Sequence, residues 1–176
     1  MKIDLTDDGE AFEGEALEVV VGRLLLDLGM RLAVAESCTG GRIAARLTRV
    51  PGSSRYFESA CVTYSNRSKE RLLSVPNALL NEKGAVSPEV ALAMAEGIRL
   101  KEEVALGLAV TGIAGPDGGS LQKPVGLVYI ALSDSDRSNA SRFHFEGARE
   151  AIQSQAAQMA LETVRRYLIA EKTRRK

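Results

Sequence analysis

Hydrophobic positions in the first part of the chain change their spacing from helical to strand-like and back. Apolar side chains recur at intervals of three and four residues at Leu17, Val20, Val21, Leu24 and Leu28. This spacing predicts a first helix, which Gly29 would end. The apolar run 32–35 predicts a short strand, residues 40–49 a second helix, and the small, β-branched and aromatic residues 59–64 a second strand.

The rest of the chain continues this alternation and ends with a hairpin and a long helix. Ser87, Pro88 and Glu89 form a strong helix start, because they place a capping hydroxyl, a proline and an acidic residue where a helix favours them. That helix should extend to Lys101. The other predicted elements are a helix that begins near Asn66, helices over 76–83 and 149–168, and strands over 105–110, 125–132 and 140–145.

These elements favour an α/β fold, a three-layer α/β/α sandwich around a mixed, mostly parallel sheet. Helices alternate with strands early in the chain, whereas a polar stretch joins the two late strands as in an antiparallel hairpin. A chain of 176 residues can bury roughly 70% of its unfolded surface around one core. We expect one domain over residues 11–170, a flexible arm at 1–10 and a charged, solvated tail at 171–176.

Charge balance and hydrophobicity exclude several classes of protein. The 23 basic residues balance 23 acidic ones, and 45% of the residues are hydrophobic, so no nucleic-acid footprint is expected. No apolar run approaches the ~20 residues of a membrane span, and the acidic amino terminus lacks the apolar core of a secretion signal. The expected location is cytoplasmic. Two cysteines are too few for a disulfide framework.

The turn between the first strand and the second helix carries three nucleophilic side chains in a row, Ser37, Cys38 and Thr39. Free N–H groups at the start of a helix would point toward them, as they do toward bound anions. This is a suitable place for acyl transfer or for binding an anion. The alternative is that the hydroxyls only cap the helix, and that Gly40 and Gly41 only form its turn.

Two further segments should meet this turn at the carboxyl ends of the strands, where the sites of open α/β sheets collect. Tyr64 and Lys69 flank the second strand-to-helix corner, although a strand-end tyrosine and a solvated lysine would have the same sequence. The glycine-rich loop 111–119 follows the buried strand 105–110, and its amides could approach a phosphate or an oxyanion. This loop matches neither the dinucleotide fingerprint nor the lysine-bearing phosphate loop.

The single histidine limits the available catalytic chemistry. A histidine-dependent serine nucleophile would have to use His144, and a zinc site would have to gather it with Cys38, Cys61 and a carboxylate. His144 lies in an alternating, strand-like segment, so we expect a structural role for it and another base in any enzyme. The Ser-x-x-Lys spacing at 120–123 is interpreted as chance, because the flanking glycine and proline leave no room for the helix that this motif requires.

Five short motifs follow one another along the chain: AESCTGG at 35–41, YSNRSK at 64–69, GAVS at 84–87, TGIAGPDGG at 111–119 and KPVG at 123–126. Together they resemble the CinA C-terminal domain family, over residues 17–168. The resemblance implies an α/β/α domain that stands alone or follows a larger amino-terminal domain, and we expect the stand-alone form. The chain departs from the family pattern at Ala148 and Gln153, where Asp and Arg are more common, which predicts altered specificity, activity or assembly.

That family includes nicotinamide-nucleotide amidases, so the resemblance implies hydrolysis of the carboxamide of nicotinamide mononucleotide to nicotinate mononucleotide and ammonia. The serine, tyrosine and lysine of the family match Ser37, Tyr64 and Lys69. We expect no metal and no cofactor, a small-molecule nucleotide as substrate, no nucleic-acid or membrane partner, and a homo-oligomer, dimer or higher. The alternative is a nucleotide-binding or regulatory domain that keeps the pocket without turnover.

Amide hydrolysis suits these three residues. Ser37 would be the nucleophile, Lys69 the base that later returns the proton to ammonia, and Tyr64 a relay or an orienting group. A lysine has a reference pKa of about 10.4, whereas a base needs a value of ~7–8, so Lys69 should lie in a partly dry pocket. Cys38 is the rival nucleophile, but the sequence offers it no histidine partner.

The remaining candidates would bind the oxyanion or the substrate. Backbone amides around Thr39 and Gly40 would hold the oxyanion, and loop 111–119 would hold the ribose phosphate, with Arg42 as a weaker phosphate candidate. The full set of expected binding residues is Cys38, Thr39, Gly40, Gly41, Arg42, Asn66, Thr111, Gly112, Gly115, Gly118 and Gly119.

Overall fold

The computed structural model describes residues 14–175, and the expected arm at 1–10 lies outside them. In chain order the elements are α1 Leu17–Asp27, β1 Leu32–Glu36, α2 Arg42–Thr48, the 3₁₀ turn η1 Ser53–Arg55, β2 Phe57–Val62, α3 Asn66–Leu73, α4 Asn77–Lys83, α5 Pro88–Lys101, β3 Leu106–Gly112, β4 Leu127–Ser133, β5 Ser138–His144 and α6 Arg149–Arg174. Each helix and strand predicted from the hydrophobic pattern is present.

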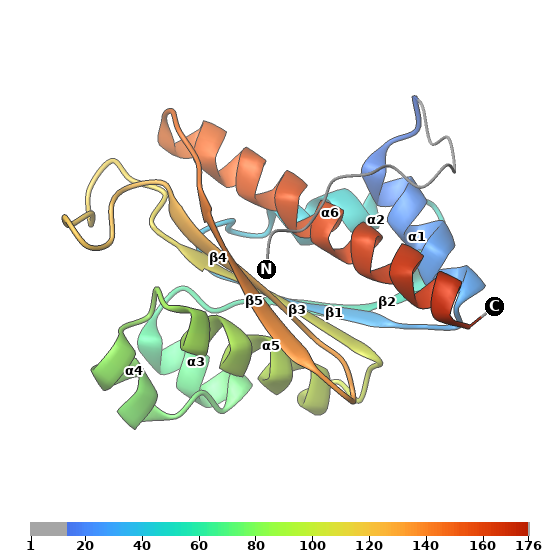
Figure 1. The fold of residues 1–176 in the computed structure, drawn as a ribbon, viewed down its shortest axis with the longest axis horizontal. Coiled ribbons are helices and arrows are strands. Elements are labelled where there is room, and N and C mark those ends of the chain that lie inside the picture. Colours follow the sequence, from blue (N-terminus) through green and yellow to red (C-terminus); the bar gives the residue numbers. More distant parts are fainter. Residues whose placement is uncertain (1–13, 176) are drawn as a thin grey trace.

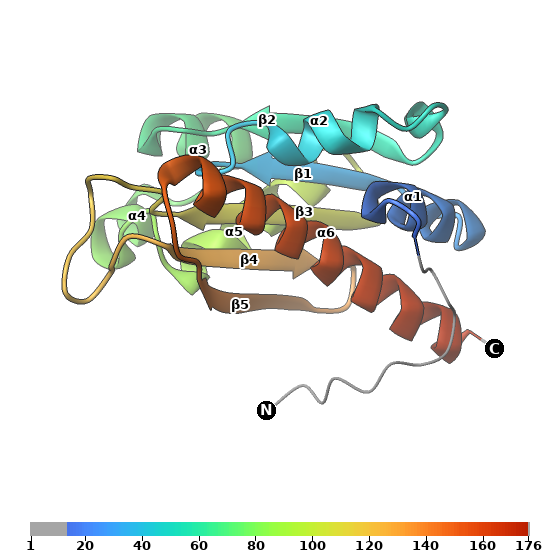
Figure 2. The same cartoon turned by 90° about the horizontal axis from the view of Figure 1, so that it is seen from above.

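The five strands form one mixed sheet in the order β2-β1-β3-β4-β5 (Figure 2). β1 pairs in parallel with β2 and β3, whereas β4 pairs antiparallel with both β3 and β5. β1, β2, β3 and β5 thus point the same way, and among the described strands β4 alone opposes them. The carboxyl ends of β1, β2 and β3 therefore lie together at one end of the sheet, here called its carboxyl edge, as the predicted fold requires.

Helices cover both faces of the sheet and complete the predicted three-layer sandwich. α1, α2 and α6 pack on one face, and α3, α4 and α5 pack on the other (Figure 1). Successive residues of a strand point to opposite faces, so the sheet contributes side chains to two separate hydrophobic clusters. The fold is the α/β/α sandwich expected from the sequence.

The two faces of the sheet carry side chains of different size. Leu32, Val34, Leu106, Leu108 and Val110 face α1 and α6, whereas Ala33, Ala35, Ala109 and Ala131 face α5. The small side chains let α5 lie close to the sheet: a Cβ added at Gly107 would lie 2.2 Å from the carbonyl oxygen of Ala95. A Cβ added at Gly97 would lie 2.1 Å from the carbonyl oxygen of Leu73, at the end of α3. These close contacts fix the position of α3 relative to the sheet.

Two strand boundaries differ from the sequence-based expectation near the carboxyl edge. β2 ends at Val62, so Tyr64 lies in the connection to α3 and not in the strand. β3 continues through Thr111 to Gly112, because both residues pair with β4. The beginning of the predicted glycine-rich loop is therefore part of the sheet, which makes the position of Thr111 more rigid than a loop would.

The carboxyl-terminal segment differs from the expected solvated tail. α6 continues as a helix through Arg174. Glu171 pairs there with Arg137, Arg174 and Arg175, which ties the last turn to the β4–β5 connection. Although α6 has 26 residues, neither it nor any other described helix is apolar enough to cross a membrane.

Candidate active site

A buried carboxylate directly before Ser37 holds the turn that follows β1. Glu36 is the last residue of β1 and is fully buried. Its carboxylate accepts hydrogen bonds from the amides of Gly41 at 2.8 Å, Ile43 at 3.3 Å and Ala44 at 2.9 Å. The sequence predicted that the amides at the start of this helix are free for an anion. That prediction is wrong, because Glu36 itself is the anion that caps α2.

The glycine pair shapes the turn. The amide of Gly40 donates to the carbonyl oxygen of Ser37 at 3.2 Å, which closes a four-residue turn. Gly40 and Gly41 have φ angles of +61° and +96°, a region that residues with a side chain rarely adopt. Both amides are thus occupied, so Gly40 does not supply the oxyanion donor expected of it. Within residues 14–175, the amides of this turn that have no acceptor are those of Ser37, Cys38 and Thr39.

Lys69 reaches Ser37 from the first turns of α3. The Ser65 side chain caps this helix by accepting from the amide of Ser68, and the Ser68 side chain accepts from the amide of Ser65. Lys69 Nζ lies 3.1 Å from Ser37 Oγ and 2.6 Å from the carbonyl oxygen of Thr63. Lys69 is 1% exposed and Ser37 is 8% exposed. The nucleophile and the base predicted from the sequence are therefore in hydrogen-bond contact inside the protein.

Burial changes the protonation of this site. Desolvation lowers the pKa of Lys69 below the ordinary lysine value, because a buried ammonium loses its hydration. A thiolate at Cys38 would raise the pKa of Lys69 again. However, burial raises the pKa of the Cys38 thiol to about 12, so Cys38 stays neutral and poorly nucleophilic near pH 7. The pair of Ser37 and Lys69 has the properties of a nucleophile and a neutral base.

A cavity of about 260 Å³ opens onto Ser37 at the carboxyl edge of the sheet. The predicted site residues that line it are Ser37, Cys38, Tyr64, Lys69, Thr111, Gly112, Gly115 and Gly118. The predicted residues outside this lining are Thr39, Gly40, Gly41, Arg42, Asn66 and Gly119. The three segments that were expected to converge do meet at one cavity.

Several expected binding residues have other contacts. Arg42 donates from Nη1 to the carbonyl oxygen of Thr39 at 3.4 Å, and Asn66 is exposed on the first turn of α3. Thr111 lines the cavity, but its hydroxyl donates to the carbonyl oxygen of Ala85 at 2.8 Å. This hydrogen bond joins the GAVS segment to the end of β3. Thr111 therefore holds two walls of the cavity together.

Arg149 is a functional candidate that sequence reasoning missed. It is the first residue of α6, lines the cavity, donates to the carbonyl oxygen of Gly115 at 2.6 Å and donates to Tyr64 Oη. A basic residue at this position opposes the helix dipole, and that mismatch was the signal in the sequence. Tyr64 is 60% exposed at the rim. Its hydrogen bond goes to Arg149, and within the described chain it has none to Ser37 or Lys69.

The two departures from the family pattern flank this arginine. Ala148 precedes α6 as its N-cap and makes no side-chain hydrogen bond. Gln153, one turn into α6, is 8% exposed and donates from Nε2 to the carbonyl oxygen of Cys38 at 2.7 Å. Gln153 thus contacts the turn that carries Ser37, from the helical layer opposite to Lys69.

The candidate zinc ligands do not gather. Cys61 lies on β2 and His144 on β5, at opposite edges of the sheet. Across residues 14–175, no group of three His, Cys, Asp or Glu side chains could hold a metal ion. The Ser-x-x-Lys segment 120–123 is not helical, and Lys123 donates to the carbonyl oxygen of Lys83 at 2.6 Å. The segment therefore lacks the helix that this motif requires, as the sequence predicted.

The sequence of this chain is similar to a known domain family and to longer proteins that contain it. The model of the CinA C-terminal domain matches residues 14–168. A CinA-like protein of Geobacter metallireducens is 53% identical over 160 residues, which are 91% of this chain and 39% of that protein. The chain therefore spans well under half the length of this curated relative.

Two solved structures share both the fold and the sequence pattern. A competence-damaged protein (CinA) superfamily protein from Klebsiella pneumoniae superimposes with a TM-score of 0.84 at 32% identity, over 88% of this chain and 96% of that one. The competence/damage inducible protein CihA from Agrobacterium tumefaciens gives a TM-score of 0.80 at 38% identity, over 89% and 97% of the two chains. From its motifs, its fold and these relatives, the chain belongs to the CinA C-terminal domain family.

Proposed function

We propose that this protein is an amidohydrolase that converts nicotinamide mononucleotide to nicotinate mononucleotide and ammonia. The observation that carries the proposal is the 3.1 Å contact between Lys69 Nζ and Ser37 Oγ inside the protein. A buried lysine with a lowered pKa is a suitable base for a serine, and this pair lies on the wall of a cavity. No histidine is needed for this chemistry.

The first half of the reaction is transfer of the acyl group to Ser37. Neutral Lys69 takes the proton of the Ser37 hydroxyl as Oγ forms a bond to the carboxamide carbon. The carbonyl oxygen becomes an oxyanion, which the amides of Cys38 and Thr39 are free to bind. Lys69 then gives its proton to the nitrogen, the carbon–nitrogen bond breaks, and ammonia leaves. The thiol of Cys38 takes no part.

The second half is hydrolysis of the resulting ester. Water attacks the acyl carbon while Lys69 accepts one of its protons, and a second oxyanion forms at the same place. When the bond to Ser37 breaks, Lys69 returns the proton to Oγ. Throughout, the carbonyl oxygen of Thr63, 2.6 Å from Nζ, holds one N–H of Lys69 so that the lone pair of the neutral amine faces Ser37.

The shape of the cavity supports a substrate with a small reactive end and an anionic end. Its volume of about 260 Å³ lies below the roughly 300–1,000 Å³ of pockets that enclose whole drug-sized ligands. The pyridine carboxamide would therefore enter the cavity while the ribose phosphate stays toward the rim. Arg149 lies at this rim, held by Gly115 and Tyr64, and its guanidinium suits a phosphate.

The test is incubation of the purified protein with nicotinamide mononucleotide, with ammonia measured enzymatically and the product identified by mass spectrometry. Ser37→Ala and Lys69→Ala should each lower kcat by roughly 10³-fold or more while the protein stays folded. Ser120→Ala is a matched serine control outside the cavity and should keep full activity. Robust turnover by Ser37→Ala would overturn the proposal. A rise in Tm with the nucleotide but no ammonia would favour the nucleotide-binding alternative.

A further inference from the structure

The hydrogen bond from Gln153 to the turn after β1 acts on one peptide group. Gln153 Nε2 donates to the carbonyl oxygen of Cys38 at 2.7 Å. That carbonyl and the N–H of Thr39 belong to the same planar trans peptide, so they point in opposite directions. A side chain that fixes the carbonyl therefore also fixes the direction of the Thr39 amide.

The layers of the fold show where that amide points. Gln153 lies on α6, on one face of the sheet, whereas Lys69 lies on α3, on the other face (Figure 1). The Cys38 carbonyl is directed toward α6. The Thr39 N–H is therefore directed away from α6, toward the side on which Lys69 meets Ser37. Like the amides of Ser37 and Cys38, the Thr39 amide has no acceptor within the described chain.

This peptide is the one that can rotate in such a turn. The hydrogen bond from the Gly40 amide to the Ser37 carbonyl closes a four-residue turn with Cys38 and Thr39 at its centre. The two common turn types differ by a flip of this central peptide, and the flipped form requires a positive φ at the third residue. Thr39 is not among the residues with positive φ, so the turn is in the unflipped form that directs its N–H away from Gln153.

We propose that Gln153 is a positioning residue that holds the Cys38–Thr39 peptide so that the Thr39 N–H binds the oxyanion. This rests on the proposed amidase function. Neither Gln153 nor Thr39 lines the cavity, whereas Cys38, which shares this peptide with Thr39, does. Gln153 therefore acts only through the peptide that it holds. Glu36 fixes the other side of the turn through Gly41. In this arrangement Gln153 on α6 holds the oxyanion donor from one helical layer. Lys69 on α3 reaches the nucleophile Ser37 from the other layer.

The test compares Gln153→Met and Gln153→Glu with the wild type. Methionine keeps the length of the side chain but donates no hydrogen bond, and glutamate keeps its shape but presents an acceptor to the carbonyl. An oxyanion donor acts mainly in the transition state. We therefore expect kcat for nicotinamide mononucleotide to fall by roughly 10- to 10³-fold while KM changes by less than about threefold. Gln155→Met is the matched control, because Gln155 is exposed on the same helix and bonds to Glu146 and Ala151.

A second readout does not depend on turnover. Pyridine-3-carboxaldehyde can add to Ser37 and form a tetrahedral adduct with an oxygen in the oxyanion site, whereas nicotinamide binds as a planar amide. Both Gln153 variants should weaken binding of the aldehyde by at least about tenfold and leave binding of nicotinamide unchanged, because the adduct alone requires the donor. Each titration is made below the Tm of the variant, so that loss of folding is not mistaken for loss of binding.

The outcomes separate the two proposals. If the wild type releases no ammonia, the proposed function fails, and the aldehyde-to-amide ratio still decides the role of Gln153. If the wild type releases ammonia but both variants keep kcat and aldehyde affinity within about twofold, the positioning role is overturned. The same holds if aldehyde and nicotinamide lose affinity equally, because that result indicates a general distortion of the cavity.

Discussion

At the scale of a single residue, the burial of Lys69 lowers the pKa of its amine. The lowered pKa predicts how activity depends on pH. The base is the neutral amine, so kcat/KM should rise with pH through the lowered pKa of Lys69 and level off above it. The midpoint should lie below 10.5, the ordinary value. A pH profile of kcat/KM measures it, and a midpoint at the ordinary value would contradict the assignment. Lys69→Arg, which stays protonated, should be folded and inactive.

Tyr56 gives a second residue-scale prediction, on stability. Its side chain is 2% exposed, and its hydroxyl has no hydrogen-bond partner among residues 14–175. A buried, unpaired hydroxyl costs about 1–3 kcal/mol, so Tyr56→Phe should raise Tm by roughly 2–4 °C for each kcal/mol recovered. Thermal unfolding measures the change. Gly22→Ala should lower Tm, because its Cβ would lie 2.6 Å from the Tyr56 ring. A lower Tm for Tyr56→Phe would mean that its hydroxyl does have a partner.

At the residue scale, the sequence predicted the side chains that belong to recognisable motifs better than those whose role depends on the folded contacts. Ser37 and Lys69 were identified and are in contact. Glu36 was not, because a carboxylate at a strand end gives no sign that it will turn back and cap the next helix. Arg149 and Gln153 come from a helix more than 100 residues away, and only the packing of α6 brings them to the turn.

At the scale of elements, the hydrophobic period predicted the order of helices and strands, and the misplaced boundaries have a common cause. β2 ends earlier than expected and β3 continues further, in both cases because pairing with a neighbouring strand decides where a strand ends. The period of a single segment contains no information about its partner. Likewise, ion pairs of Glu171 stabilise the last turn of α6, and one of them goes to Arg137 in the β4–β5 connection. The composition of a charged tail does not reveal such pairs in advance.

The close packing of α5 leads to an element-scale prediction. A Cβ at Gly97 would lie 2.1 Å from the Leu73 carbonyl oxygen, so Gly97→Ala must push α3 outward. Overpacking of this kind costs about 1–3 kcal/mol. Because α3 carries Lys69, the variant should also lose kcat, by roughly tenfold or more if Lys69 moves out of contact with Ser37. Glu96→Ala, at the adjacent exposed position, should change neither quantity. A Gly97→Ala protein with unchanged Tm and kcat would contradict this packing argument.

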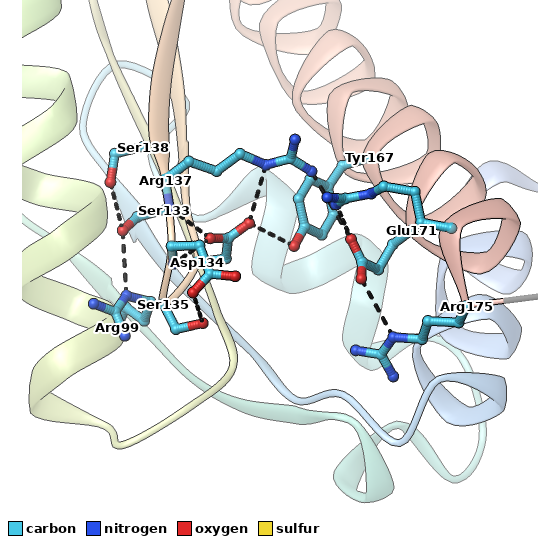
Figure 3. Close-up of polar contacts among 11 residues, drawn as sticks. Arg99, Ser133, Asp134, Ser135, Arg137, Ser138, Tyr167, Glu171 and Arg175 are labelled. Atoms are coloured by element: carbon cyan, nitrogen blue, oxygen red, sulfur yellow. Dashed lines mark hydrogen bonds and ion pairs between the residues drawn. The ribbon is translucent and has the colours of Figure 1, made fainter.

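At the scale of the whole molecule, α6 connects two polar networks at opposite ends of the sheet. Its 26 residues extend about 39 Å at roughly 1.5 Å per residue. The amino-terminal end supplies Arg149 to the cavity and Gln153 to the turn that carries Ser37. Near the carboxyl-terminal end, Tyr167 donates to Asp134 at 2.7 Å, beside the Arg137 and Glu171 ion pairs (Figure 3). Asp134 follows the β4 residue that pairs with the start of β3, so this network lies at the far end of the sheet from the cavity.

This separation predicts that the distal network affects stability without affecting catalysis. Burial tends to raise the pKa of Asp134, but hydrogen bonds from Tyr167 and from the amides of Asp136 and Arg137 outweigh it and lower that pKa. The stabilisation is therefore present above 3.8, the ordinary value, and is lost as pH falls through the lowered value. Tyr167→Phe should cost about 1.5–3 kcal/mol at neutral pH.

Measurements of Tm and kcat on the same Tyr167→Phe protein test this prediction. Its Tm should fall by roughly 2–4 °C for each kcal/mol at neutral pH. The difference from the wild type should shrink in acid, since protonated Asp134 no longer offers a charged acceptor to Tyr167. Tyr129→Phe is the matched control, because Tyr129 is a half-buried tyrosine on β4 that packs in the other hydrophobic cluster, away from this network. A fall in kcat for Tyr167→Phe at a temperature where it is folded would show that the two ends of α6 are coupled.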